Sequence, residues 1–379
     1  MTLTLPDFAL EVYLARYEFS AKHYLCGSDA QTLTVRELLD MANDEEREAF
    51  DQLPLSYLPN WGSERLLDAI AATYDEVDSE HILTFAGAGE GIFWAMQRLL
   101  EPGDHAVVVL PTFQVTETVA LAVGAEVSGL ALDPAEGWAL DLDRLRGLLR
   151  PDTRLLAVNF PNNPTGALTE HDTFRAIVEL CEERGIRLFS DEVYRGAEPD
   201  PDHTLPQAAD LSPTAVSLNV MSKSYGLSGL RIGWIACRDR QLLERLERGK
   251  HYTTTSNSAP SELLAAIALR NGDAIHARVR SVIARNVSLF SSFFADWPEL
   301  FEWEPPQAGC VCFPRYRGPG SVDDLCLELV ERSGVALLPG SVFRSELAPV
   351  PDDRFRVGVG REGVEAGLAA FDDFLRRRV

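Results

Sequence analysis

Residues 220–231 read VMSKSYGLSGLR and surround one lysine with small and hydroxylated residues. The run follows an apolar segment, 216–220, so Lys223 is expected just past the end of a buried strand. Arg231 stands eight residues further on. An amine in this setting suits condensation with an aldehyde cofactor whose phosphate the arginine holds. A lysine on an ordinary surface needs none of these neighbours, so the run predicts a catalytic lysine.

Two more segments precede this run, NFPNNPTG at 159–166 and SDEVY at 190–194. In this order and spacing the segments resemble the class I/II aminotransferases, pyridoxal-phosphate enzymes of fold type I. The resemblance covers nearly the whole chain. It implies a pyridoxal 5'-phosphate cofactor, an amino acid and a 2-oxo acid as substrates, and a homodimer. The ends of the chain also resemble a branch that includes capreomycidine synthase-like enzymes, which cyclise a hydroxylated arginine.

The composition is that of an ordinary soluble globular protein. The chain has 379 residues, 46% of them hydrophobic, which is enough for one large core and a smaller one. Its apolar stretches are broken well before the roughly 20 residues that a bilayer needs, and no leader pattern begins it, so a cytoplasmic location is expected. Six scattered cysteines without a CxxC pair are expected to be reduced and mostly buried, and no histidine spacing suggests a metal site.

The formal net charge of −23 argues against nucleic acid or an anionic membrane as a partner, because both need a basic face. The same charge gives only weak support to a cationic substrate, because it says nothing about one local pocket.

Between about residues 62 and 237, short apolar runs alternate with helical periodicity. Strands are expected at 81–85, 106–110, 155–159, 187–190 and 216–220. Most are apolar on both faces, which is typical of a parallel sheet that helices cover on both sides. One crossover helix is expected before Gly185, with one apolar face made by Phe174, Ile177, Val178 and Cys181. These patterns predict an α/β fold, a three-layer αβα large domain with a mostly parallel sheet.

The pattern changes after residue 237. A long helical stretch from roughly 260 to 297 precedes short strands around 311–313 and 355–357. The last helix ends in three arginines, which suit its negative end, and carries one apolar stripe of Val364, Leu368, Phe371 and Leu375. These elements predict a smaller α+β domain, to which the resemblance adds the N-terminal arm. The expected boundaries are 48–255 for the large domain, and 1–47 with 256–379 for the small one.

The candidate site residues follow the ends of expected strands, where open α/β sheets bind their ligands. A glycine-rich turn at 87–91 opens a helix, so the free N–H groups of Ala88 and Gly89 suit a phosphate, although a plain tight turn would read the same way. Asp191 ends a buried strand, where an unpaired carboxylate is costly. A protonated pyridine nitrogen would supply the cation that it needs, and the alternative role is a helix N-cap.

The resemblance implies roles for four more residues. Tyr194 and Asn163 would hydrogen-bond the phenolic oxygen of the cofactor, although Asn163 also suits an ordinary turn. Phe113 would stack on the pyridine ring, a position where an aromatic is more often part of the core. Arg231 would bind the phosphate as a bidentate partner, and Ser222 could add a hydroxyl.

Three positions bear on the rest of the site. Tyr57 would reach the phosphate of a neighbouring subunit, so the active site would need a homodimer. Arg356 would clamp the α-carboxylate of the substrate, with a structural role for Arg356, or Arg361 in its place, as alternatives. The sequence departs from the family at Val220, where a serine or threonine usually donates to the phosphate.

These residues predict an aminotransferase that works through an aldimine on Lys223, with the freed amine removing the α-proton. The alternative is a lyase or cyclase, because the same carbanion can undergo β-elimination, replacement or cyclisation. A transcription regulator is opposed by the few residues before Tyr57 and by the acidic charge. Specificity is expected in the loops and the arm, with His23, Tyr24, Trp61, Arg195 and Tyr252 as candidates.

Overall fold

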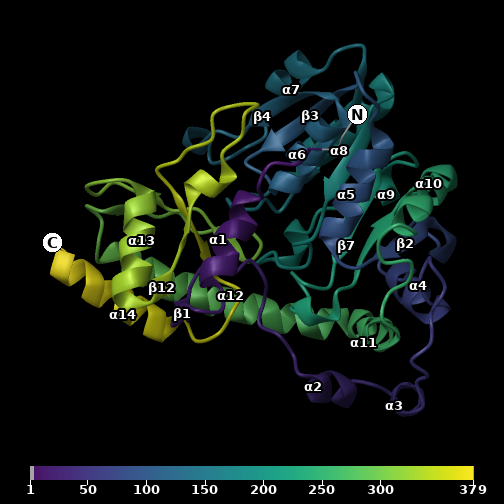
Figure 1. Cartoon of the computed structure of the whole chain (residues 1–379), viewed down its shortest axis with the longest axis horizontal. Helices are drawn as coiled ribbons and strands as arrows, with labels where there is room; N and C mark the ends of the chain where they lie inside the picture. Colours follow the sequence, from purple (N-terminus) through teal and green to yellow (C-terminus); the bar gives the residue numbers. More distant parts are fainter. Residues whose placement is uncertain (1–3, 379) are drawn as a thin grey trace.

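The strands predicted for the large domain belong to one seven-stranded sheet and end at the same edge of it (Figure 1). The structure is a computed structural model and describes residues 4–378. The strand order is β2-β8-β7-β6-β5-β3-β4. Strand β8 runs antiparallel to β2 and β7, and the other neighbours are parallel. All strands except β8 therefore end at the same edge. The bounds are β2 (Ile82–Phe85), β3 (His105–Leu110), β4 (Glu126–Ala131), β5 (Thr153–Asn159), β6 (Arg187–Asp191), β7 (Val216–Val220) and β8 (Gly233–Ala236).

Helices cover both faces of this sheet, as the apolar strands predict (Figure 1). In β3, the side chain of Val108 belongs to one hydrophobic cluster, whereas Val107 and Val109 belong to another. Each fully buried side chain of this size stabilises the fold by roughly 1.5–3 kcal/mol. The first cluster includes residues of α5 (Ala88–Leu99), and the second includes residues of α8 (His171–Arg184). The predicted three-layer αβα arrangement is confirmed.

The predicted strands of this sheet match the observed ones within about two residues, and two further strands of the sheet, β4 and β8, were missed. Strand β4 lies at the edge of the sheet and is mostly half-buried, so it lacks the continuous apolar run of a central strand. The predicted crossover helix is α8, and Gly185 ends it with a left-handed φ of 64°. The long helical stretch is two helices, α11 (Ala259–Arg270) and α12 (Gly272–Ala295), separated at Asn271.

A second, smaller part combines the two ends of the chain. Strand β1 (His23–Tyr24) pairs in parallel with β12 (Val335–Ala336), so the N-terminal arm joins the C-terminal elements. Strand β14 (Phe355–Gly358) pairs with β10 (Val311–Cys312) and β13 (Leu338–Pro339). The domain boundaries given above stay a prediction.

The other elements complete the two parts. They are α1 (Ala9–Tyr17), α2 (Val35–Asp40), α3 (Asp44–Asp51), α4 (Glu64–Ala71), α6 (Gln114–Val123), α7 (Leu142–Leu148), α9 (Ala208–Leu211), α10 (Arg240–Lys250), α13 (Val322–Ser333), α14 (Val364–Arg378), β9 (Phe301–Glu302) and β11 (Arg315–Tyr316).

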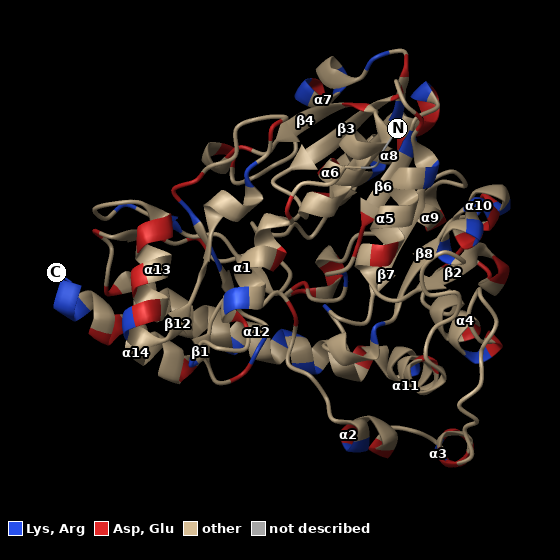
Figure 2. Cartoon of the chain, viewed as in Figure 1, with Lys and Arg blue, Asp and Glu red and all other residues tan. Residues whose placement is uncertain are grey.

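Charged residues lie mainly on the peripheral helices and loops, and the middle of the sheet is largely free of them (Figure 2). All six cysteines are free and buried, as expected. Among residues 4–378, no helix combines the length and the apolar character needed to cross a membrane.

Candidate active site

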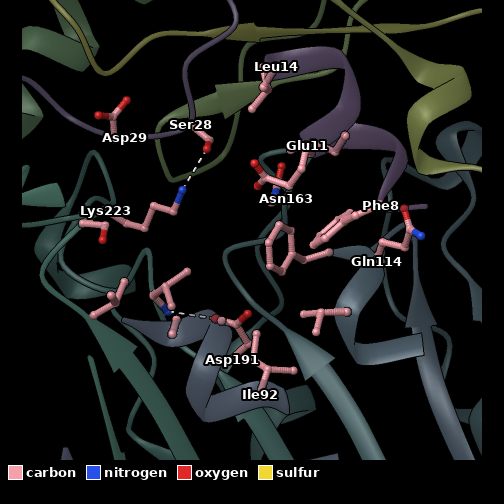
Figure 3. A pocket seen from close by; sticks show the side chains of 18 of the residues that line it. Phe8, Glu11, Leu14, Ser28, Asp29, Ile92, Gln114, Asn163, Asp191 and Lys223 are labelled. Atoms are coloured by element: carbon pink, nitrogen blue, oxygen red, sulfur yellow. Dashed lines mark hydrogen bonds between the residues drawn. The ribbon is translucent and has the colours of Figure 1, made fainter. Parts of the chain in front are cut away.

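A cavity of about 650 Å³ opens at the edge where the parallel strands end, and helix α1 covers it (Figure 3). Lys223 and Asp191 point into this space from the sheet side, and Glu11 and Phe8 face them from the arm. Tyr57 does not line the cavity of its own chain, and its side chain is 91% exposed. The cavity brings together ten of the predicted site residues, namely Ala88, Gly89, Phe113, Asn163, Asp191, Tyr194, Ser222, Lys223, Arg231 and Arg356.

One corner of the cavity combines a helix N-terminus with a guanidinium. Helix α5 begins at Ala88, and its first N–H groups have no partner within the helix. Gly87 precedes it with a φ of 93°, and a Cβ there would lie 2.5 Å from Nη2 of Arg231. Only glycine therefore lets the arginine approach the helix end. Positive charge and free N–H groups converge here, as anion binding requires.

Arg231 itself adopts a left-handed backbone with a φ of 54°, which is uncommon for a residue other than glycine. Its Nη1 donates to the carbonyl oxygen of Ser228 at 3.1 Å and approaches Oγ of Ser222 at 3.5 Å. The buried side chain of Val220 lines the same cavity without a donor. Ser222 and Ser228 are the hydroxyl residues of this run that line the cavity, so either can replace the missing donor.

Asp191, the last residue of β6, is only 8% exposed. Among residues 4–378, one group donates to its carboxylate, the N–H of Val193 at 3.2 Å. Burial raises the pKa of Asp191 to about 7. A turn, not a helix, follows it, which removes the alternative role as a helix N-cap. A cation in the cavity would stabilise the ionised carboxylate.

The amine of Lys223 lies at the centre of the site. Its Nζ donates to Oγ of Ser28 at 2.8 Å (Figure 3). Burial lowers the pKa of Lys223, and the nearby positive charge of Arg356 lowers it further. Both effects favour the neutral amine, which is the nucleophilic form.

Arg356 is almost completely buried, at 1% exposure, on strand β14. Its Nη1 donates to Oδ1 of Asn163 at 3.0 Å, and its Nε and Nη2 donate to the carbonyl oxygen of Cys26 at 3.2 and 2.9 Å. These acceptors are neutral, so the positive charge remains available to an anion. Arg361 instead forms a bidentate pair with Asp29 at 2.7 and 2.8 Å. That pairing leaves Arg356 as the better carboxylate partner.

Two more polar side chains, Asn163 and Tyr194, line the cavity near Arg356 and Lys223. Asn163 accepts from Arg356 through its oxygen, which leaves its amide N–H groups as donors. Tyr194 donates to the carbonyl oxygen of Ser28 at 2.9 Å, and burial raises the pKa of its phenol. Both residues follow a strand end, on neighbouring strands β5 and β6.

Phe113 lines the cavity and contacts Phe8 of the arm, with ring centroids 4.9 Å apart and planes tilted by 54°. Its position just past β3 is as predicted, and it is half-buried. An aromatic ring that lines the cavity is available to a flat ligand.

The arm was expected to contribute to specificity, but no residue of helix α1 was among the candidates. Gln114 holds the start of the helix, because its Oε1 accepts from the N–H of Ala9 at 2.9 Å and its Nε2 donates to the carbonyl oxygen of Asp7 at 2.9 Å. Tyr13 donates to the carbonyl oxygen of Leu337 at 2.7 Å. The helix thereby presents Leu10, Glu11 and Leu14 to the cavity, and Glu18 lines it directly after the helix ends. Their spacing marks a helix face, but nothing local indicates what that face covers.

Most of the proposed specificity residues lie elsewhere. Of the five candidates, only Tyr24 lines the cavity of this chain. Trp61 lies under the guanidinium of Arg240 at 3.8 Å, and Nε of Arg195 donates to a backbone oxygen. The ring of Tyr252 is 84% exposed. The residues that were missed instead include Ser28 and Asp29 in the loop after β1.

Residues 24–370 match the family model described as aminotransferase class I and II. Capreomycidine synthase of Streptomyces vinaceus is 34% identical over 378 residues, which cover 98% of this chain and 94% of that protein. A PLP-dependent aminotransferase from Streptococcus suis 89-1591 superposes with a TM-score of 0.91 and 30% identity, covering 99% of this chain and 98% of that one. The PLP-dependent cyclase OrfR gives a TM-score of 0.89 with 28% identity, over 100% and 99% of the two chains.

Proposed function

The chain belongs to the aminotransferase class I and II family and has the fold of the fold type I pyridoxal-phosphate enzymes, and on this premise we propose that it moves an amino group between an L-amino acid and a 2-oxo acid. The observation that carries the proposal is the meeting of three groups in one cavity. These are the amine of Lys223, the buried carboxylate of Asp191 and the unneutralised guanidinium of Arg356.

The residues of the cavity fit pyridoxal 5'-phosphate. The corner formed by the N-terminus of α5 and Arg231 suits its phosphate, and the cradle needs glycine at position 87. Asp191 suits a protonated ring nitrogen, because a buried carboxylate needs a cation. Asn163 and Tyr194 suit its phenolic oxygen. When bound, the cofactor supplies an aldehyde and a ring that withdraws electrons from the α-carbon of the substrate.

Each side chain of the cavity then has its own role in the reaction. Lys223 acts first as the nucleophile and, once free, as the base that takes the α-proton on its Nζ. Arg356 holds the α-carboxylate with its planar fork and so fixes which substituent faces the amine. Asp191 stays ionised and keeps its partner cationic. Helix α1 limits the access of water to these groups.

We also propose that Tyr57 acts in the cavity of a second copy of the chain. Its near-complete exposure and its absence from its own cavity support this role. An exposed tyrosine can donate to a phosphate only if another surface carries that phosphate to it.

Cyclisation of an amino acid is the second candidate function. The similarity to capreomycidine synthase over 98% of the chain and the likeness to the cyclase OrfR favour it. Both functions use the same base and the same carboxylate clamp, so the cavity residues described above serve either one. The two functions differ in whether the amino group leaves the substrate.

A reaction without an amino acceptor separates the two candidates. For amino-group transfer, the holoenzyme mixed with its donor should release one equivalent of 2-oxo acid per active site and then stop, without ammonia. For cyclisation, product should accumulate over many turnovers with the amino group retained. Continuous release of ammonia would instead indicate elimination.

The wall opposite the sheet supports a substrate with a cationic side chain. Glu11, Glu18 and Asp29 line the cavity, and Arg361 neutralises only Asp29. Burial raises the pKa of Glu18, and the charges of Asp29 and Glu11 raise it further, although Arg361 opposes them. A cation between these carboxylates would relieve their mutual repulsion. These carboxylates at the cavity wall therefore support a cationic substrate more strongly than the net charge of the chain does.

We expect Glu18→Gln to lower kcat/KM for lysine, ornithine or arginine by about 10-fold, which corresponds to roughly one charge-assisted hydrogen bond. The values for neutral donors such as methionine should change less than about 2-fold. Steady-state kinetics with a panel of donors checks this. Glu48→Gln on α3, which does not line the cavity, is the matched control. An equal loss for cationic and neutral donors would contradict the assignment.

A further inference from the structure

Ser28 contacts two groups of the proposed site through different atoms. Its hydroxyl oxygen accepts from Nζ of Lys223 at 2.8 Å (Figure 3). Its backbone carbonyl oxygen accepts from the phenol of Tyr194 at 2.9 Å. Ser28 lies 195 residues before the lysine, in the loop that follows β1. No sequence pattern around Lys223 indicates this contact.

The backbone on both sides of Ser28 is fixed to the C-terminal elements. A side chain on Gly358 would collide with the backbone oxygen of Gly27, so the two chain segments touch directly. The N–H of Gly358 donates to the carbonyl oxygen of Leu25 at 2.7 Å. Asp29 is held by both nitrogens of the Arg361 fork. The loop that places the hydroxyl beside the amine is therefore held in position on both sides of Ser28.

A serine hydroxyl at this place has a specific physical effect. A neutral amine has two N–H groups and one lone pair, and the lone pair makes the nucleophilic attack and takes the proton. When one N–H donates to a fixed hydroxyl oxygen, the rotation of the amine is restricted and the lone pair stays free. A carboxylate here would instead favour the protonated amine, and that form has no lone pair.

We infer that Ser28 is a positioning residue that orients the amine of Lys223, an assignment that rests on the proposed function. It acts on the attack by the amine and on the proton transfer, and it contributes little to substrate affinity. The bidentate pair of Asp29 with Arg361 maintains its position. The loop after β1 is thereby part of the catalytic machinery and also of the pocket wall.

The test compares Ser28→Ala, which removes the hydroxyl, with Ser28→Thr, which keeps it. The first readout is the rate at which the cofactor-free protein takes up pyridoxal phosphate, followed by absorbance. The second is kcat and KM with one donor, with and without α-deuterium. Ser20→Ala is the matched control, because that hydroxyl also lies on the arm but bonds to the carbonyl oxygen of Arg16.

Ser28→Ala should slow cofactor uptake and lower kcat by about 10–100-fold, the loss typical of a misplaced catalytic group, with KM changed less than about 3-fold. The α-deuterium isotope effect on kcat should rise, because proton transfer becomes slower. Ser28→Thr should recover most of both rates, and Ser20→Ala should match the wild type. Melting curves report whether each variant is folded.

Wild-type uptake and kcat in Ser28→Ala would overturn the inference. Equal losses in the alanine and threonine variants would also overturn it, because they would point to packing instead of the hydroxyl. Borohydride reduction of each variant keeps this result separate from the proposed function. A pyridoxyl label on Lys223 in Ser28→Ala shows that the covalent link between this lysine and the cofactor, on which the proposed function depends, forms whatever the role of Ser28. A wild-type chain without that label refutes the function itself.

Discussion

Lys223→Ala is expected to lose covalent capture of pyridoxal phosphate and at least about 10³-fold in turnover, because one side chain supplies both the nucleophile and the general base. Borohydride reduction followed by peptide mass spectrometry checks the first part. In the wild type, the pyridoxyl label should appear on the peptide that contains Lys223. In the variant, the label should be absent, although the noncovalent contacts to the phosphate and the ring nitrogen remain.

The small number of lysines makes this experiment unusually clear. The chain contains only Lys22, Lys223 and Lys250. Lys250 is the natural competitor, because it is fully buried and burial lowers its pKa to about 8. It does not line the cavity, however, and its Nζ donates to the carbonyl oxygen of Asn60 at 2.6 Å. A label on Lys250, or turnover that survives in Lys223→Ala, would contradict the proposed site.

Asp191→Asn is expected to change activity and stability in opposite directions. With cofactor bound, removal of the carboxylate leaves a buried ring nitrogen without its anionic partner. Breaking such a pair costs about 3–5 kcal/mol, so turnover should fall by roughly 10²–10⁴-fold. Steady-state assays at saturating cofactor check this part. Glu192→Gln is the matched control, because Glu192 is also a buried carboxyl group but does not line the cavity.

Without cofactor, the same substitution should stabilise the protein at high pH. Burial raises the pKa of Asp191 from 3.8 to about 7, so the folded state disfavours the ionised form. The resulting loss of stability is absent below pH 3.8, grows as the pH rises, and is complete above about pH 7. At 1.36 kcal/mol per pKa unit, Asp191→Asn should be more stable than the wild type by up to about 4 kcal/mol at pH 8. Urea unfolding at pH 8 and near pH 4 measures the difference. Equal unfolding midpoints for the two proteins at pH 8 would contradict it.

Most of the central sheet could be predicted because its inner strands are short and largely apolar on both faces. Strands β3 and β7, for example, are buried at every residue, as is typical of short strands that helices cover on both faces. The antiparallel direction of β8 could not be predicted, because Gly233–Ala236 has the composition of any buried strand. Direction is set by the connection and by the neighbours, which a local pattern does not contain. The break at Asn271 was missed because the apolar periodicity continues through it.

Some residues of the candidate site could likewise be predicted from the sequence, and others could not. Lys223, Asp191 and Asn163 could be singled out because each follows a strand end within a local motif, and parallel strands bring such ends together. Ser28 and Glu11 could not, because they reach the cavity only after the arm pairs with β12 and packs over the sheet edge. These contacts span hundreds of residues, and no periodicity in the arm encodes their partner.

In the proposed function, the nine-residue helix α1 contributes to substrate recognition but carries none of the groups that make or break bonds. The bond-making groups are distributed over strand ends that the whole sheet holds in register, so they resist piecemeal change. The proposed contacts to the substrate side chain, by contrast, lie partly on this short helix, and substitutions there leave the sheet intact. A few substitutions in α1 could therefore change which substrate is accepted without disturbing the groups that carry out the reaction.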